Sequence, residues 1–133
     1  QNWEYELLED VAYQAPNRVV LVPRMFSYDG ASIPSWAWRV IYTPFDPIVM
    51  LPALVHDWIY LSHEVTKPEA DLVLRDLLRR NGVPGWRQFL IYWAVRLAGA
   101  FAWRNSAQDL AYANWLKGQL YAAGVDVSRY RWP

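Results

Sequence analysis

The sequence predicts an α+β domain that is mainly α-helical, with a small N-terminal β-hairpin or sheet packed on a bundle of about four helices. The first third of the chain alternates apolar and polar residues and lacks helical periodicity. From residue 48 onward, apolar residues recur at helical spacing, and capping motifs separate the expected helices. The 133 residues, of which 54% are hydrophobic, are enough for a single domain with one core and argue against disorder.

The expected β element occupies residues 1–25. The segment Trp3–Leu7 alternates apolar and acidic residues, as in a strand with one exposed face. A β-branched run follows at Arg18–Val22 and ends at Pro23. Between them, Ala15–Asn17 contains a proline and predicts a turn. The two segments therefore predict a hairpin or a small sheet.

A short helix is expected after the β element. Asp29-Gly30 is typical of a tight turn. Ser32 and Pro34 have the spacing of a helix cap and a first turn, which predicts a helix that ends at about Ile41. The prolines within residues 43–47 then interrupt the chain.

Two long helices are expected next. Ile48–Ser62 is apolar at nearly every position, which predicts burial on most sides, and Pro52 predicts either a later start or a kink. The second helix begins at Thr66 and Glu69, which have the spacing of a capping box, and it ends at Asn81-Gly82. Because only a few residues separate the two helices, we expect them to be antiparallel neighbours.

Two further helices are expected at Pro84–Trp103 and Ser106–Ala123. The apolar stretch Phe89–Trp103 would be only about 22 Å long as a helix, too short to span a bilayer. No transmembrane segment is therefore predicted. An alternative is a helix that lies in a membrane interface, because tryptophan is common there. Residues 26–103 form the expected core of the domain, and residues 104–133 form a C-terminal helix and tail.

Composition excludes several classes of function. The formal net charge is zero and the basic residues form no run, so nucleic-acid binding is not expected. The absence of cysteine excludes thiolate catalysis and zinc sites built on sulfur. Ser32 and Ser62 lack the strand–turn–helix context of a nucleophilic serine. His63 lies at a helix end, where we expect it to be solvated.

The pair His56-Asp57 is polar within the otherwise apolar helix Ile48–Ser62. A buried imidazole and a buried carboxylate are costly unless each has a partner. His56 and Tyr60 share one helical face, whereas Asp57 points about 100 degrees away from His56. Asp71 lies on the inner face of the next helix, so antiparallel packing predicts that it faces this group.

One interpretation of these residues is structural. Asp57 or Asp71 would pair with Arg75 or with Arg96, the only cation inside an otherwise apolar segment. If only one arginine reaches these carboxylates and that of Asp29, negative charge remains, and a divalent cation would neutralise it.

The other interpretation is a metal-assisted hydrolytic site. His56 would be the general base, and Asp71, helped by Tyr60, would orient its ring. Asp57 and Asp29 would be ligands to a divalent metal, calcium or zinc, that polarises the scissile group. No organic cofactor is expected.

The segment His56-Asp57-Trp58-Ile59-Tyr60, taken with Asp71, resembles the motif of secreted phospholipase A2. That motif is His-Asp followed by a Tyr at the same offset, with an Asp from an antiparallel helix behind the His. The resemblance implies a hydrolytic role for these positions. The chain departs from that family at Ile59, where the family has Cys, and no Gly-rich calcium loop precedes the helix.

A broader set of motifs occurs in order over roughly Phe26 to Trp103: Asp29–Pro34, His56-Asp57, Glu69–Asp71, Gly82–Pro84 and Tyr92–Gly99. This set resembles the phage and prophage family called domain of unknown function 1353 (DUF1353). The resemblance implies a small phage-encoded protein, and the family pattern brings Asp29, His56, Asp57 and Asp71 together. Residues 106–133 lie outside the shared core and could form a docking segment.

Two classes of function are therefore expected. The first is a phage- or prophage-encoded hydrolase that acts on an ester or amide of the bacterial envelope. The alternative is a non-enzymatic virion component, of the tail or of assembly, in which the polar residues are structural and exposed aromatic residues contact other proteins. The expected partners are virion proteins or envelope components, and the expected location is the virion or the infected bacterial cell.

Overall fold

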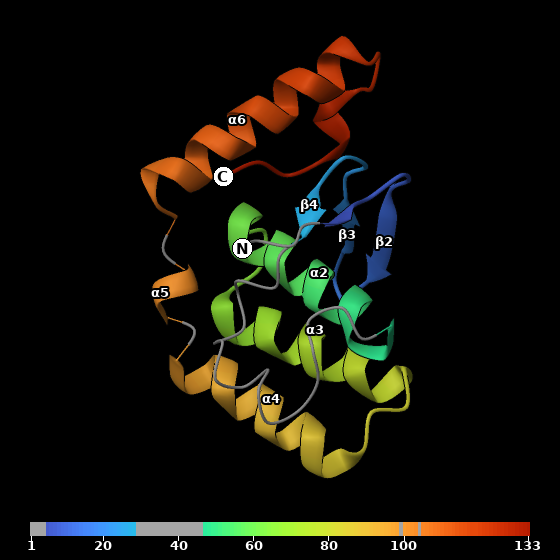
Figure 1. Cartoon of the computed structure of the whole chain (residues 1–133), viewed down its shortest axis with the longest axis vertical. Coiled ribbons are helices and arrows are strands. Elements are labelled where there is room, and N and C mark those ends of the chain that lie inside the picture. The colour runs from blue at the N-terminus through green and yellow to red at the C-terminus, as the bar shows by residue number, and fades with distance from the viewer. Residues whose placement is uncertain (1–4, 29–46, 99, 104) are drawn as a thin grey trace.

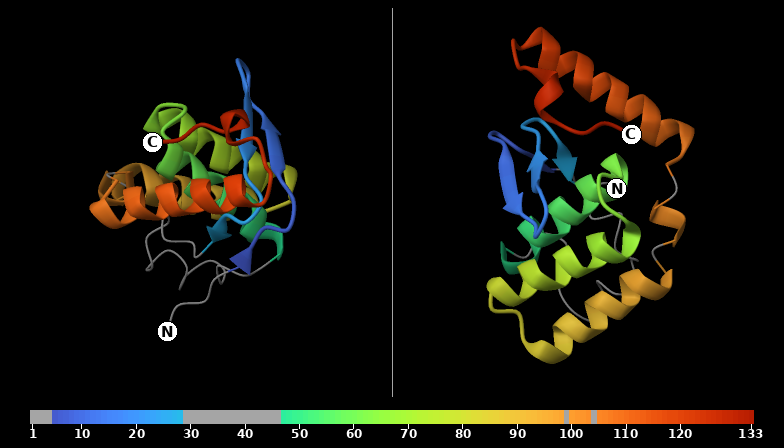
Figure 2. Two further views of the ribbon diagram at one scale, coloured as in Figure 1. Left: turned by 90° about the horizontal axis from the view of Figure 1, so that it is seen from above. Right: turned by 180° about the vertical axis from the view of Figure 1, so that it is seen from behind.

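The computed structural model describes residues 5–28, 47–98, 100–103 and 105–133 (Figure 1). Three helices, α2 (Pro47–Ser62), α3 (Lys67–Arg80) and α4 (Gly85–Ala98), lie side by side, with α3 in contact with both neighbours. The strands and helix α6 (Ala107–Ala122) lie on the side of α2 that faces away from α4 (Figure 2). The predicted fold class, mainly α with a small N-terminal β element, is confirmed.

The β element consists of two antiparallel pairs. Strands β2 (Val11–Gln14) and β3 (Val19–Val22) form a hairpin, and the amide of Ala15 donates to the carbonyl of Arg18 at 2.8 Å across the turn. Strand β1 (Tyr5–Glu6) pairs with β4 (Ser27–Tyr28).

The predicted turn at Ala15–Asn17 is correct, but the strand that precedes it in the hairpin is β2 and not the segment Trp3–Leu7. Pro23 has no N–H with which to extend the ladder of β3. Met25 then adopts a left-handed backbone conformation, with φ of 71°, and donates to the carbonyl of Leu7 at 2.7 Å. This return of the chain pairs β1 with the residues after Pro23.

Helix α2 is the buried centre of the molecule. Val55 and Trp58, which the sequence places inside, are 1% and 0% exposed. Pro52 lies within the continuous helix and cannot donate to the carbonyl of Ile48. The side-chain amide of Asn81 donates to that carbonyl at 3.0 Å instead, which ties the end of α3 to the start of α2.

Helix α3 begins and ends where the sequence predicts. Thr66 is its N-cap, and Glu69 completes the capping box. Its C-cap is Asn81, and Gly82 follows with φ of 82°, a conformation that glycine adopts without strain. Ala70 and Leu74 on its inner face are fully buried against the core.

Within the predicted third helix, Pro84–Trp103, the structure describes α4 and a short helix, α5 (Ala100–Trp103), and residue 99 between them lies outside the described residues (Figure 1). Helix α5 contacts α2. The Trp103 ring meets the Tyr60 ring edge-on at 5.0 Å and stacks on His63 at 3.8 Å. These ring contacts hold α5 against the C-terminal end of α2.

The C-terminal helix α6 is confirmed, with Ser106 and Asp109 as its capping box. A short 3₁₀ helix, η1 (Val127–Arg129), follows within the tail. The tail returns to the core, where Trp132 packs edge-on against Trp58 at 5.6 Å. In the described part of the chain, none of the helices has the length and apolarity needed to cross a membrane.

Candidate functional site

The carboxylate of Asp71 on α3 contacts His56 and Tyr60, the two residues of α2 that the sequence predicts to face it. His56 Nε2 lies 2.8 Å from Asp71 Oδ1, and the Tyr60 hydroxyl donates to the same oxygen at 2.6 Å. His56 and Asp71 are both 0% exposed. The antiparallel contact of α2 and α3 brings these three side chains together as the spacing of the sequence predicts.

Two cations contact the second oxygen of Asp71. Lys67 Nζ donates to Oδ2 at 2.9 Å, and Arg96 Nη1 donates to it at 3.2 Å. Lys67 also donates to the carbonyl of Val95, near the end of α4, at 2.9 Å. We refer to this group as the Asp71 cluster, and its members are Asp71, His56, Tyr60, Lys67 and Arg96.

The sequence interpretation named Arg96 as a partner but missed Lys67. The signal was present, because Lys67 and Asp71 are four residues apart on one helix and such pairs face each other. Arg75, the other arginine considered, lies with its guanidinium 5.4 Å from the centre of the Tyr92 ring.

The cluster keeps Asp71 ionised. Burial by itself would raise the pKa of this carboxyl group, but the hydrogen bonds from His56 and Tyr60 and the neighbouring Lys67 ammonium group outweigh it, so the pKa falls to about 2. Burial and the adjacent carboxylate raise the pKa of the Tyr60 hydroxyl. Tyr60 therefore acts as a neutral donor.

His56 is held in its neutral form. Burial lowers its pKa, and although Asp71 acts in the opposite direction, the positive charge of Lys67 adds to the lowering. In the tautomer that donates from Nε2 to Asp71, the lone pair is on Nδ1. The ring also packs on Tyr60, with ring centres 4.2 Å apart, so its orientation is fixed.

Asp57 is half-buried and lies close enough to influence Tyr60, whose pKa its negative charge helps to raise. Asp29 lies outside the described residues, as does the short helix expected at residues 32–41. Within residues 5–28, 47–98, 100–103 and 105–133, no group of three or more His, Asp or Glu side chains is arranged to hold a metal ion. The metal-binding role of Asp57 and Asp29 stays a prediction.

Of the three residues that the sequence analysis judged unsuited to catalysis, Ser32 lies outside the described residues, and His63 and Ser62 have structural contacts. His63 is exposed at the end of α2 and stacks on Trp103, and its Nε2 lies 2.6 Å from the Trp103 carbonyl. The Ser62 hydroxyl donates to Glu64 at 3.2 Å. Both contacts hold the end of α2 against neighbouring segments.

Comparison with known proteins gives a family match. The family described as "Protein of unknown function (DUF1353)" matches residues 5–95. The match includes β1 to β3, which precede the motifs quoted above, and it ends before α5 and α6. The predicted membership is thus confirmed, while the phage origin implied by the resemblance stays a prediction.

A curated relative is the uncharacterized protein y4jT of Sinorhizobium fredii, which is 33% identical over 96 residues. The aligned part is 71% of this chain but only 29% of the length of that relative. No solved structure matches the chain.

Proposed function

We propose that this chain, which belongs to the DUF1353 family, is a metal-assisted hydrolase that acts on an ester or amide of the bacterial envelope. The observation that carries the proposal is the buried hydrogen bond of 2.8 Å between His56 Nε2 and Asp71. It is the contact expected from the resemblance of this segment to the helix motif of secreted phospholipase A2.

In this proposal His56 is the general base. A neutral imidazole whose Nε2 donates to a carboxylate has a lone pair on Nδ1 that can accept a proton from water. The oxygen of that water attacks the carbonyl carbon, and the proton on Nδ1 then passes to the leaving alcohol or amine. Asp71 orients the ring and stabilises the transient imidazolium, and Tyr60 holds the carboxylate in place.

The cation would be held by Asp57 with Asp29. The cluster fits this division of roles, because both Asp71 oxygens already accept hydrogen bonds while the Asp57 side chain leaves α2 in another direction. Calcium or zinc there would supply a Lewis acid that polarises the scissile carbonyl.

The biological setting is proposed from the same resemblance. A phage- or prophage-encoded hydrolase would act in the infected bacterial cell or in the virion, where a phage must cross the envelope to enter or leave.

A second candidate, a non-enzymatic virion component with a structural cluster, is favoured by a specific observation. Lys67 and Arg96 offset the negative charge of Asp71 without a metal, and His56 is fully buried. An ion pair of this kind is also found in proteins where it has no catalytic role.

The variant His56→Gln separates the two candidates. Glutamine keeps a donor and an acceptor but does not titrate near neutral pH, so the hydrolase loses activity by about a hundredfold or more while it remains folded. The measurement is hydrolysis of phospholipid, peptidoglycan and simple ester substrates with calcium or zinc supplied. His63→Gln, the other histidine of the chain, is the matched control and keeps wild-type activity.

The metal-binding part is tested by titration calorimetry of wild type and Asp57→Asn with calcium, magnesium and zinc. We expect binding that the variant weakens. Inactivity of the wild-type protein on all three substrate classes, with each metal present, would overturn the hydrolase and leave the virion component.

A further inference from the structure

The outer face of α4 exposes a row of large apolar side chains. They are Trp86, Phe89, Leu90, Trp93 and Leu97, which we call the α4 stripe, and they are between 39% and 79% exposed. Their spacing of three and four residues places them on one side of the helix. The opposite side packs into the core through Ile91, Ala94 and Val95.

This distribution is unusual for a helix at the surface of a protein. Such a helix normally presents polar and charged residues outward, as α3 does with Glu69 and Arg79. A contiguous apolar patch on a surface commonly marks an interaction site. The α4 stripe is therefore a surface on which we expect a partner.

Basic side chains lie beside the stripe. Helix α4 has no carboxylate and contains two arginines, Arg87 and Arg96, of which Arg96 is already paired with Asp71. The Arg87 guanidinium lies 4.9 Å from the Trp86 ring centre. Arg75 adds a further cation beside this helix through its contact with Tyr92. A partner with a negative, partly apolar surface matches this combination.

We propose that the α4 stripe binds an anionic lipid surface, with the helix axis parallel to the membrane plane. The 14 residues of α4 span about 21 Å, too short to cross a bilayer. Tryptophan is enriched at the membrane–water interface, and cationic residues beside it attract anionic headgroups. Binding is measured without turnover, so the inference is independent of the proposed hydrolysis.

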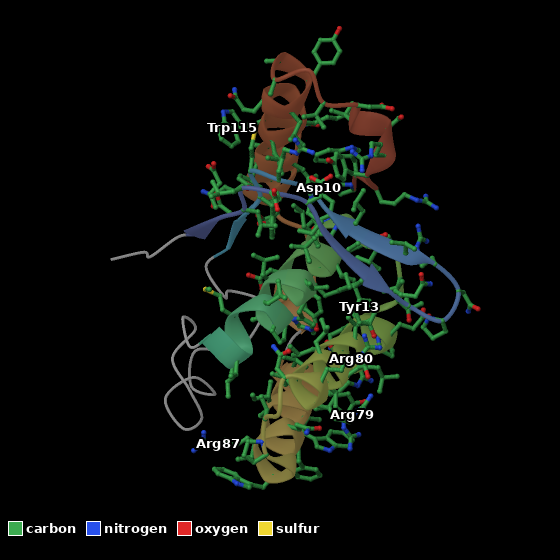
Figure 3. The ribbon with its side chains drawn as sticks, turned by 90° about the vertical axis from the view of Figure 1, so that its right-hand side faces the viewer. Asp10, Tyr13, Arg79, Arg80, Arg87 and Trp115 are labelled. Carbon is green, nitrogen blue, oxygen red and sulfur yellow. The ribbon has the colours of Figure 1, made fainter. Side chains whose placement is uncertain are left out.

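The position of α4 permits this contact. It forms one edge of the layer of three helices, and α6 lies at the other end of the molecule (Figure 1). In Figure 3, Arg87 on α4 and Trp115 on α6 are at opposite ends. Trp115 is 53% exposed, so it offers a matched control for a tryptophan of the stripe.

The test is flotation of the full chain with vesicles of phosphatidylcholine alone and with an equimolar mixture of phosphatidylcholine and phosphatidylglycerol. We expect binding to the mixed vesicles. The double variant Phe89→Ser/Trp93→Ser loses affinity by at least about tenfold, because two large apolar side chains no longer enter the interface. Trp115→Ser binds as the wild type does.

The charge contribution is tested separately. Arg75→Gln and Arg87→Gln each reduce binding to the mixed vesicles by about fivefold, whereas binding to phosphatidylcholine alone is nearly unchanged. Circular dichroism melting of every variant establishes that the helices remain folded. Loss of binding by a folded stripe variant supports the inference.

Three results would overturn it: no binding of the wild type to either vesicle, equal binding of wild type and stripe variant, or equal losses in the stripe and Trp115 variants. Sedimentation velocity identifies the main competitor. If the wild type forms a dimer that the stripe variant does not form, and neither binds vesicles, the stripe is a protein interface instead.

Discussion

The Asp71 cluster and the α4 stripe depart from the usual distribution of side chains in opposite ways. The cluster places charged and polar groups in the core, where Asp71 and His56 are 0% exposed. The stripe places aromatic and aliphatic groups on the surface, where Leu97 is 79% exposed. Inside, the polar groups of α2, α3 and α4 bind one another. Outside, the apolar side chains of the stripe face solvent.

The polar groups of the cluster have their partners within the chain, whereas the apolar groups of the stripe need a partner outside it. In the cluster, a single carboxylate accepts from His56, Tyr60, Lys67 and Arg96, so the cost of burial is offset within the chain. In the stripe, the cost of hydrating apolar surface is removed only by another molecule. The cluster should therefore determine stability, and the stripe should determine association.

The largest effect is expected from Asp71→Asn. The amide keeps the size of the side chain but removes the charge between Lys67 and Arg96, so the free energy of unfolding should fall by about 3–5 kcal/mol. Urea unfolding followed by circular dichroism measures this loss. Asp76→Asn on the same helix, where the arginine partners are at the surface and the amide oxygen can still accept from the Tyr13 hydroxyl, should cost about 1 kcal/mol or less. Equal stability of Asp71→Asn and wild type would contradict the expectation that the Asp71 cluster determines stability.

An intermediate effect is expected on acidification. The pKa of Asp71 is about 2 in the folded protein against 3.8 ordinarily, so its contribution is present above pH 3.8 and is lost as pH falls toward 2. This difference corresponds to about 2 kcal/mol. The lowered pKa of His56 means that the unfolded chain takes up a proton first, so stability also begins to fall below about pH 6.5.

Unfolding midpoints of wild type and His56→Gln over this pH range check both contributions. The variant should lack the loss that begins near pH 6.5, and it should keep part of the loss at lower pH because Tyr60 and Lys67 still lower the pKa of Asp71. A His56→Gln curve parallel to that of the wild type throughout would mean that His56 has no lowered pKa.

The smallest effect is expected in the stripe. Leu97→Ala should change the free energy of unfolding by no more than about 0.5 kcal/mol, because the side chain is already hydrated. Leu74→Ala, at a position that is 0% exposed, should cost about 2–5 kcal/mol. Thermal melts of the two variants compare the regions directly. A large loss from Leu97→Ala would show that the stripe is covered within the chain.

Local sequence signals predicted the helices well. The capping boxes at Thr66 and Ser106 define the starts of α3 and α6, because satisfying the first amides of a helix requires these residue types. The pairing of His56 with Asp71 was predictable from helical spacing and a short connection. The role of Lys67 was missed, since a lysine at the start of a helix is usually solvated.

Pairing between distant segments was the harder part. The strand Val11–Gln14 contains two residue types that are common in strands, Val11 and Tyr13, but it is only four residues long and its pairing depends on the turn that follows it. The ring contacts of Trp103 with Tyr60 and His63 join α5 to α2, and no local pattern encodes them.

The contact between Trp132 and Trp58 joins the C-terminal tail, which lies outside the family match, to the core of the domain. Trp58 is a central core residue, yet one of its ring neighbours comes from the tail, beyond the region shared with the family at residues 5–95. In this chain the tail therefore completes the core of the shared region. We expect a protein that carries only that region to cover this side of the core with a segment of its own, so a transfer of the domain between proteins should include the covering segment.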